Sequence, residues 1–325
     1  MGSHFEKGRC IPGCSDNWWA GISQGVKVVG SEDGEALTQQ PVWDGLTAEE
    51  LQRQFDMRVA VPDGQRFVES CFVRSAPLRK SLPGARDVRY GRGPRQLLDV
   101  YPANDSAAPV VLFLHGGAWR YQSKEYFAFM APPLMQAGIT LVLASYDLHP
   151  AVTILEMMQE AREAITWAYR ELGADAGLVV SGHSAGAQLL GMALAHDFRG
   201  YGLPKSPFKG AHLISGSYDM EPHRHHERYA DMGLDEATVK AISPALNPPL
   251  DTDLPVVLVA GAEETPGYLR QAEEFSSKLR SRGHPVRVLL SSGDHHFSVV
   301  DRLGEPDHPV MQALVELCKG PRPLS

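Results

Sequence analysis

Gly-His-Ser-Ala-Gly at residues 182–186 follows the apolar run Gly-Leu-Val-Val at 177–180 and opens a helix of small residues. A strand, a sharp turn and a helix in this order hold a serine at a strained backbone angle, and glycines on both sides let the strand and the helix approach each other. We therefore expect Ser184 to stand exposed above a sheet as a nucleophile. The alternative for this stretch alone is a glycine-rich turn without chemistry.

A second motif follows another predicted strand. The run Pro-Val-Val-Leu-Phe-Leu at 109–114 leads directly into His-Gly-Gly-Ala-Trp at 115–119. Glycines directly after a buried strand expose backbone N–H groups, which acyl transfer needs to hold the oxyanion of its tetrahedral intermediate. We expect the N–H groups of Gly116, Gly117 and Ala185 to form this oxyanion hole.

Composition predicts one large α/β domain. The chain has 325 residues, of which 43% are apolar, and carries a formal net charge of −8. Without a cluster of basic residues, a nucleic-acid partner is not expected. No apolar run reaches 18 residues, and the first residues lack the pattern of a signal peptide. We expect a cytoplasmic protein that makes no membrane contact, and leave a homodimer open.

Cysteine and histidine patterns do not predict a metal site. Four cysteines are too few for a disulfide framework in a chain of this length. Cys10 and Cys14 are not followed by a second ligand pair at finger-like spacing. His223, His225 and His226 are rich in potential ligands, but a short polar segment of this kind is more often a solvated surface.

The chain divides into two parts and an insertion. Residues 1–85 are mixed and polar, and we expect them to form an N-terminal arm that caps the domain 86–325. A second cap segment is expected at about 221–249. The adjacent Trp18 and Trp19 either pack the arm on the core or roof the site.

Strands and helices alternate after residue 86, which predicts a mostly parallel sheet with helices on both faces. Thr47, three residues before Glu50, is a capping box that starts a helix near 47–57. The remaining predicted elements are a hairpin (88–90 and 96–101), strands at 109–114, 139–145, 177–180, 210–216, 255–260 and 285–290, and helices over about 155–172, 266–282 and 308–318.

The partners of a nucleophilic serine follow it in the order acid, then histidine. After the strand 255–260 comes Gly-Ala-Glu-Glu-Thr-Pro, which places a carboxylate at the carboxyl end of a strand, where α/β sheets collect catalytic groups. We favour Glu264 as the acid, with Glu263 and Asp219 as alternatives. After the strand 285–290, we favour His296 over His295 as the base. The imidazole takes the serine proton, and the carboxylate fixes its tautomer.

With these residues in place, the chain resembles the α/β-hydrolase superfamily, in its hormone-sensitive-lipase-like branch, and within it the kynurenine formamidases. The resemblance covers roughly residue 86 to the end, through the motifs at 115–119, 182–186 and 214–222. The family's Gly-x-x-Asp-x-Pro falls on 261–266, which implies Glu264 as the acid. Its Asp-His-Phe falls on 295–297, which implies His296 as the base. The acid is therefore Glu where Asp is usual, and a Glu can also orient the histidine.

The resemblance implies a serine hydrolase that cleaves an aryl formamide, or a related small amide or ester, through an acyl-enzyme and without a cofactor. We expect Trp119, His183 and Tyr218 to contact the substrate. A broad-specificity carboxylesterase would use the same residues, because both activities share these motifs. A non-catalytic ligand-binding protein of the same fold is the third hypothesis, and it fits less well because all three triad positions are chemically competent.

Overall fold

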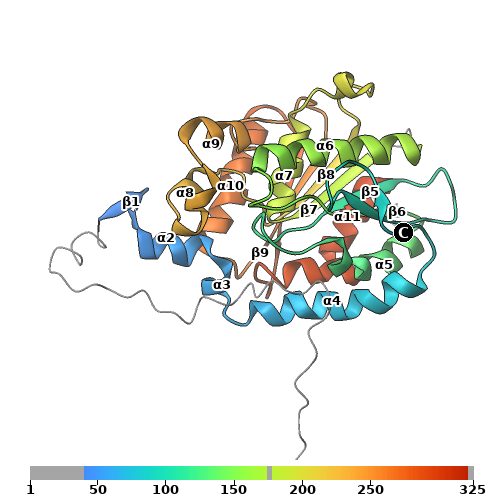
Figure 1. Cartoon of the computed structure of the whole chain (residues 1–325), viewed down its shortest axis with the longest axis horizontal. Coiled ribbons are helices and arrows are strands. Elements are labelled where there is room, and N and C mark those ends of the chain that lie inside the picture. The colour runs from blue at the N-terminus through green and yellow to red at the C-terminus, as the bar shows by residue number, and fades with distance from the viewer. Residues whose placement is uncertain (1–39, 174–177, 321–325) are drawn as a thin grey trace, which may run out of the picture.

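An eight-stranded sheet forms the centre of the computed structural model, which describes residues 40–173 and 178–320 (Figure 1). Its strands run in the order β10-β9-β8-β7-β5-β6-β4-β3. All neighbours from β10 to β6 are parallel, whereas β4 pairs antiparallel with β6 and β3. The strands are β3 (Val88–Arg89), β4 (Leu97–Tyr101), β5 (Val110–Leu114), β6 (Thr140–Ala144), β7 (Leu178–His183), β8 (Phe208–Ile214), β9 (Val256–Gly261) and β10 (Val286–Ser291).

The strands form where the sequence has short, nearly continuous apolar runs, because both faces of a parallel sheet are covered. In β5 all five residues are buried. Val110, Leu112 and Leu114 pack into the core on one face, while Val111 and Phe113 pack into the core on the other. The predicted doubly covered α/β sheet is therefore confirmed, with the ends of each strand displaced by at most three residues.

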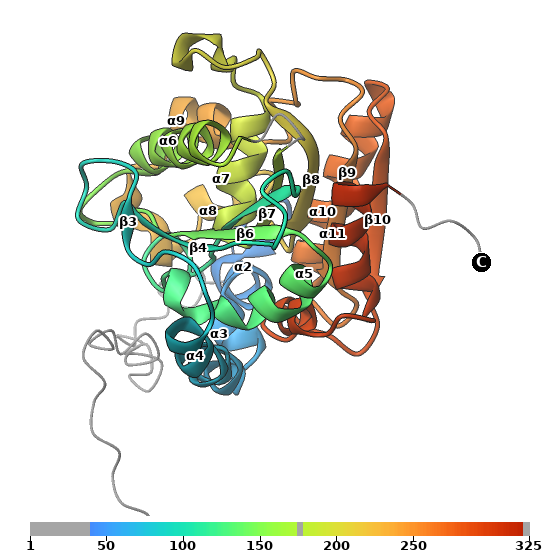
Figure 2. The ribbon, with the colours of Figure 1, turned by 90° about the vertical axis from the view of Figure 1, so that its right-hand side faces the viewer.

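Helices cover both faces of the sheet (Figures 1 and 2). The first core contains apolar side chains of α6 (Ile154–Glu171), α7 (Ala185–Leu194) and α10 (Pro266–Ser281). The second contains side chains of α4 (Gly64–Ser81), α5 (Ala131–Gln136) and α11 (Pro309–Lys319). These two layers hold the strands rigidly, so the carboxyl ends of β5, β7, β9 and β10 present their loops at one edge.

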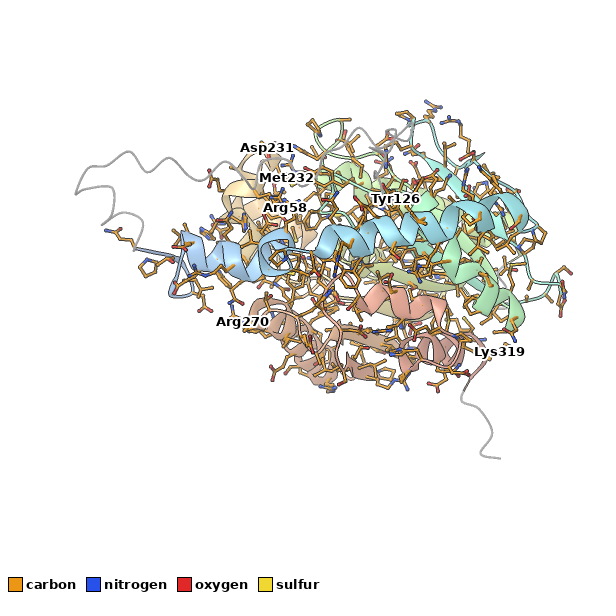
Figure 3. The ribbon with its side chains drawn as sticks, turned by 90° about the horizontal axis from the view of Figure 1, so that it is seen from below. Arg58, Tyr126, Asp231, Met232, Arg270 and Lys319 are labelled. Atoms are coloured by element: carbon orange, nitrogen blue, oxygen red, sulfur yellow. The ribbon has the colours of Figure 1, made fainter. Side chains whose placement is uncertain are left out.

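The segment before residue 86 holds more helix than the sequence predicts. Helix α2 (Ala48–Phe55) starts at the predicted capping box: the Glu50 N–H donates to Thr47, and Glu50 accepts from the Thr47 N–H. The short α3 (Met57–Ala60) and the long α4 follow. Helix α4 runs across the lower face of the molecule (Figure 3). It was not predicted, because Pro77 interrupts its pattern and the apolar Val73 faces solvent.

Short elements complete the fold. In the predicted cap segment 221–249 lie α8 (Glu221–Arg224), η5 (Glu227–Met232) and α9 (Glu236–Ile242). The remaining elements are the ribbon β1 (Pro41–Trp43) and β2 (Leu46–Thr47), and the 3₁₀ helices η1 (Lys124–Tyr126), η2 (Ala128–Met130), η4 (Phe198–Tyr201) and η6 (Val299–Gly304). Cys10, Cys14, Trp18 and Trp19 lie outside the described residues.

The described residues contain neither a candidate membrane-spanning helix nor a candidate metal cluster. Within 40–173 and 178–320, no helix is long and apolar enough to cross a membrane. In the same ranges, no three His, Cys, Asp or Glu side chains are grouped so that they could hold a metal ion.

Candidate active site

Three side chains from different loops form one hydrogen-bonded chain. His296 Nε2 lies 3.1 Å from the Ser184 Oγ, and His296 Nδ1 lies 2.9 Å from Glu264 Oε2. Because a carboxylate only accepts, Nδ1 carries the proton and Nε2 is free to accept one from the serine. The structure thus brings together the three side chains that the sequence favours as acid, base and nucleophile.

Glu264 is held as an acceptor on both oxygens. Its Oε1 accepts from the Ser215 hydroxyl at 2.5 Å and from the Gly261 N–H at 2.9 Å, while Oε2 faces His296. The carboxylate side chain is fully buried. Three donors to one buried carboxylate keep it oriented and satisfied. Ser215 lies within the motif at 214–222, which assigns it no role, and its backbone is also strained, with φ of 50°.

The alternatives for acid and base lie elsewhere. Glu263 is exposed to solvent. Asp219 accepts from the Glu221 N–H at 2.9 Å and so caps a local turn. The ring of His295 packs edge-on against Phe67, with ring centroids 4.5 Å apart, and its Nδ1 accepts backbone N–H groups. The geometry therefore favours Glu264 and His296.

The serine sits on a strained turn between β7 and α7. Ser184 has φ of 53° and ψ of −116°. A Cβ on Gly182 would lie 2.7 Å from the carbonyl carbon of Gly186, and one on Gly186 would lie 2.2 Å from the Leu114 oxygen. Any side chain at these positions would push the strand and the helix apart. The two glycines of the motif are therefore required by close packing.

The glycine loop after β5 lies directly against this turn. A Cβ on Gly116 would lie 3.0 Å from the His183 carbonyl oxygen and 3.1 Å from the Ser184 Cβ, so the loop packs closely against the serine turn. The next residues turn sharply, with φ of 107° at Gly117 and 53° at Ala118. Ala185 is the first residue of α7, so its N–H has no acceptor within the helix and lies at the positive end of the helix dipole. Gly116, Gly117 and Ala185 therefore all lie next to Ser184, and their role as an oxyanion hole stays a prediction.

A family model for the alpha/beta hydrolase fold matches residues 111–299, which contain the whole hydrogen-bonded chain. The chain belongs to the α/β-hydrolase fold family. It is 29% identical over 288 residues to a kynurenine formamidase of Salmo salar, covering 85% of this chain and 98% of that protein. It is 24% identical over 240 residues to an isoprenylcysteine alpha-carbonyl methylesterase of Arabidopsis thaliana, a match that covers 65% of this chain and 56% of that protein.

Among solved structures, this α/β-hydrolase is similar to a protein of Silicibacter sp. described provisionally as a thioesterase. The TM-score is 0.71 at 23% identity, and the match covers 81% of this chain and 97% of the other. At this identity the likeness concerns the fold.

A cavity in front of Ser184 is enclosed by both predicted cap segments. Its empty volume is about 380 Å³, including space open to solvent. Ser184 is 7% exposed, so the expectation of an exposed serine is wrong: aromatic and cationic side chains cover it. The walls come from the N-terminal segment, the glycine loop, η5, α10 and the histidine loop, and include Phe55, Met57, Arg58, Gly117, Ala118, Gln122, His183, Arg228, Tyr229, Tyr268, His296 and Phe297.

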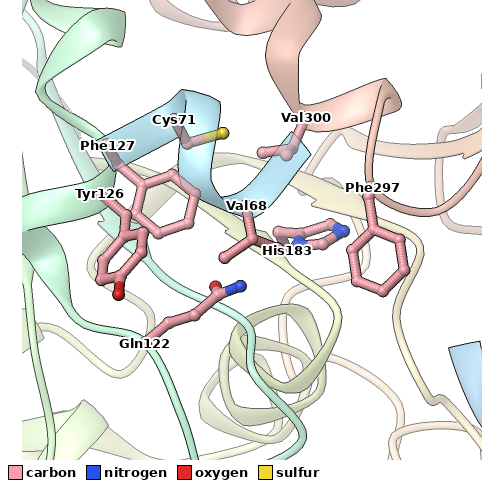
Figure 4. Close-up of a pocket in the computed structure, with 8 residues that line it drawn as sticks. All are labelled: Val68, Cys71, Gln122, Tyr126, Phe127, His183, Phe297 and Val300. Atoms are coloured by element: carbon pink, nitrogen blue, oxygen red, sulfur yellow. The ribbon is translucent and has the colours of Figure 1, made fainter. Parts of the chain in front are cut away.

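A second, mostly apolar pocket of about 260 Å³ adjoins the first (Figure 4). Phe297, His183 and Gln122 line both, so they form the wall between them. Beyond this wall the second pocket is bounded by α4, η1 and η6, through Val68, Cys71, Tyr126, Phe127 and Val300. We call it the side pocket.

Of the three predicted substrate contacts, only His183 lines the cavity. Its Nε2 lies 2.9 Å from the His296 carbonyl oxygen and donates to it, which holds the loop that carries His296. Burial, and then the nearby His296, lower the His183 pKa to about 3, so the ring stays neutral.

Trp119 and Tyr218 do not line the cavity, which corrects their prediction as substrate contacts. The Trp119 ring is buried, and its Nε1 donates to Gln188 Oε1 at 3.0 Å. The Tyr218 ring stacks on Phe275 with centroids 4.5 Å apart. Both rings support the site from behind, because the loops that carry them turn their side chains into the core.

The histidines of 223–226 are also placed differently from the prediction of a solvated surface. His223 and His226 are buried, and the His223 ring packs edge-on against Trp119 at 5.6 Å. Burial lowers the pKa of His223 to about 3 and that of His226 to about 4. His225 is half-buried, and its Nε2 lies 2.9 Å from Glu221.

The sequence missed most of the cavity wall. Phe55, Met57 and Arg58 come from a segment without a motif, and Tyr268 lies in the first turn of α10. The one available signal was the predicted capping role of 1–85 and 221–249, which pointed to the segments but not to the side chains.

Proposed function

We propose that this protein hydrolyses aryl formamides through a formyl-enzyme on Ser184. The observation that carries the proposal is the continuous chain Ser184–His296–Glu264, with separations of 3.1 and 2.9 Å, facing a small cavity with aromatic walls. The kynurenine formamidase of Salmo salar, which matches nearly along its whole length, supports the formamide as substrate.

In the first half-reaction, the Ser184 Oγ attacks the formyl carbon and His296 Nε2 takes the hydroxyl proton. Glu264 stabilises the resulting imidazolium through Nδ1–H. The carbonyl oxygen becomes an oxyanion, which the N–H groups of Ala185 and of Gly116 or Gly117 stabilise. The C–N bond then breaks, His296 returns the proton to the nitrogen, and the arylamine leaves.

In the second half-reaction, water attacks the formyl ester of Ser184 while His296 takes one of its protons. The tetrahedral intermediate uses the same oxyanion hole. When it collapses, the proton passes to the Ser184 Oγ and formate leaves. An aryl nitrogen suits this cycle, because it is less basic than an alkylamine and leaves more readily.

A carboxylesterase is the second candidate. The side pocket adjoins the cavity and is lined mostly by apolar side chains, which would contact an acyl chain longer than formyl. The methylesterase of Arabidopsis thaliana is a further relative with ester chemistry.

Turnover of N-formylkynurenine against p-nitrophenyl acetate separates the two. We expect the formamide to be cleaved with the higher kcat/KM. Cleavage of the ester alone would contradict the formamidase proposal. A ligand-binding protein without turnover would cleave neither, and the complete triad argues against it. We further propose a small-molecule substrate and a cytoplasmic location, and no nucleic-acid partner.

A further inference from the structure

Two stacked rings lie behind the glycine loop that follows β5. His115 is the first residue of this loop, and Tyr146 comes shortly after the end of β6. Both side chains are fully buried. Their ring centroids lie 4.4 Å apart, and the ring planes are 9° from parallel. Neither ring lines the cavity in front of Ser184, so neither is expected to contact a substrate.

Each ring donates a hydrogen bond to one of two consecutive backbone carbonyls. The Tyr146 hydroxyl donates to the His115 carbonyl oxygen at 2.8 Å, and His115 Nδ1 donates to the Gly116 carbonyl oxygen at 2.7 Å. Because a carbonyl only accepts, the ring proton of His115 lies on Nδ1. Burial lowers the pKa of His115 to about 3, so the ring stays neutral. Its Nε2 has no hydrogen-bond partner among the described residues.

The direction of these two carbonyls fixes the direction of two N–H groups. The peptide bonds that join residues 115, 116 and 117 are trans. In a planar trans peptide the C=O and the N–H point to opposite sides. Both carbonyls point toward the same ring stack, so the N–H groups of Gly116 and Gly117 both point away from it. Gly117 lines the cavity together with Ser184, which the stack does not.

We propose that His115 and Tyr146 are positioning residues, which aim the N–H groups of Gly116 and Gly117 at the oxyanion. The inference rests on the proposed function, because an oxyanion forms only when Ser184 attacks a carbonyl. Backbone donors stabilise such a charge best when they are oriented before the reaction begins. Two consecutive glycines have wide conformational freedom and no side chains to restrict it. Buried donors from outside the pair therefore fix its peptide planes.

Removal of one donor predicts a loss in kcat. The variant His115→Phe keeps a ring in the stack but cannot donate to the Gly116 carbonyl. Loss of an oxyanion-hole donor itself costs about 10²- to 10³-fold in kcat. His115 acts through the loop, so we expect its replacement to lower kcat by about 10- to 100-fold and to change KM by less than about twofold.

Two amide variants test the position of the donor. In His115→Asn the amide nitrogen can occupy the place of Nδ1 and donate to Gly116. In His115→Gln the amide reaches the place of Nε2, where the described residues offer no partner. We expect the Asn variant to have a kcat about 10-fold above that of His115→Phe, and the Gln variant to resemble His115→Phe. A kcat for Asn no higher than that for Gln would contradict the donor role of Nδ1.

A comparison of formanilide with thioformanilide separates positioning from general support of the fold. Sulfur accepts hydrogen bonds more weakly than oxygen, so a thiocarbonyl gains less from the two N–H groups. We expect His115→Phe to lower the ratio of kcat/KM for formanilide to that for thioformanilide by about 3- to 10-fold. The control is His212→Phe, at a buried histidine of β8 whose Nδ1 lies 3.2 Å from the Ser181 Oγ. It should leave the ratio unchanged.

An unchanged ratio in His115→Phe, whatever the fall in kcat, would overturn the proposal. If that variant does not fold, Tyr146→Phe removes a single hydroxyl from the stack, and the same ratio decides. If the wild-type protein cleaves no formamide, the proposed function fails. The ester p-nitrophenyl acetate and its thiocarbonyl analogue then test the positioning residues, because attack on either one uses the same oxyanion hole.

Discussion

His296 Nε2 lies 3.1 Å from the Ser184 Oγ, although 112 positions separate the two residues in the sequence. The sheet brings them together: Ser184 follows β7 and His296 follows β10, and the carboxyl ends of parallel strands share one edge. Glu264 follows β9, which lies beside β10. Ser184, Glu264 and His296 therefore lie on loops that follow strands of one sheet and meet at the same edge of it.

Replacing the nucleophile is the first test. Ser184→Ala should lower kcat by about a thousandfold or more, because the oxyanion hole and binding alone remain. The fold should persist, since alanine fits the same turn. Intact-mass measurement should show an acyl group on the wild-type protein during turnover and none on the variant. Unchanged activity in Ser184→Ala would refute the mechanism.

Two adjacent glutamates provide a matched pair for the acid. Glu264→Gln replaces the acceptor for His296 Nδ1–H with an amide and should lower kcat by about 10³- to 10⁴-fold. Glu263→Gln changes an exposed side chain one position away and should leave kcat within about twofold. Steady-state kinetics of both variants on one substrate suffice. Loss of activity in Glu263→Gln alone would reverse the assignment.

The triad was predictable because each member belongs to a short motif that follows an apolar strand. The carboxyl ends of parallel strands share one edge of the sheet, so these motifs become neighbours in the fold. Gly182 and Gly186 were predictable for a related reason, since their requirement is local close packing. The positions of Arg58 and Arg228 in the cavity wall were not predictable, because nothing near them in sequence reports that Asp56 binds both. Their positions depend on how the two cap segments meet.

Trp119 shows the opposite error. Its place in a glycine-rich motif suggested a substrate contact, but the direction of its side chain depends on two consecutive residues with positive φ, Ala118 and Trp119 itself. Sequence patterns do not specify that turn. Helix α4 was missed for a further reason: its contacts with η1 and η2 stabilise a stretch whose own apolar pattern is weak.

Trp119→Phe tests the supporting role. Trp119 Nε1 donates to Gln188 Oε1, and Gln188 Nε2 donates to the Ile242 carbonyl at 2.7 Å, so the indole ties the glycine loop to α7. The variant leaves Gln188 Oε1 buried without that donor, which should lower the free energy of unfolding by about 1–3 kcal/mol. KM should change by less than about twofold. A tenfold higher KM at unchanged stability would instead support the prediction that Trp119 contacts the substrate.

Phe297→Leu tests the wall between the cavity and the side pocket. A smaller side chain joins the two spaces, so the ratio of kcat/KM for p-nitrophenyl butyrate to that for the acetate should rise about 3- to 10-fold. The ratio is the readout, because Phe297 also packs on His296 and absolute rates can fall. Phe198→Leu, at a buried ring of η4 that packs against Phe208 of β8, is the matched control and should leave the ratio unchanged.

His212→Asn tests the proton linkage of the buried histidines. Burial lowers the His212 pKa to about 3, whereas an unfolded histidine titrates near 6.5. Between these values the unfolded state binds a proton that the folded state does not, so stability is present above about pH 6.5 and falls as the pH decreases. Each such histidine contributes about 1.4 kcal/mol per pH unit to the slope of the free energy of unfolding against pH.

The free energy of unfolding of the variant, from urea titrations, should therefore fall less steeply than that of the wild type by about this amount between pH 5.5 and 4.5. Above pH 7.5 the two slopes should agree, because both states are then neutral at this position; equal slopes in the acidic range as well would mean that His212 takes up its proton while folded.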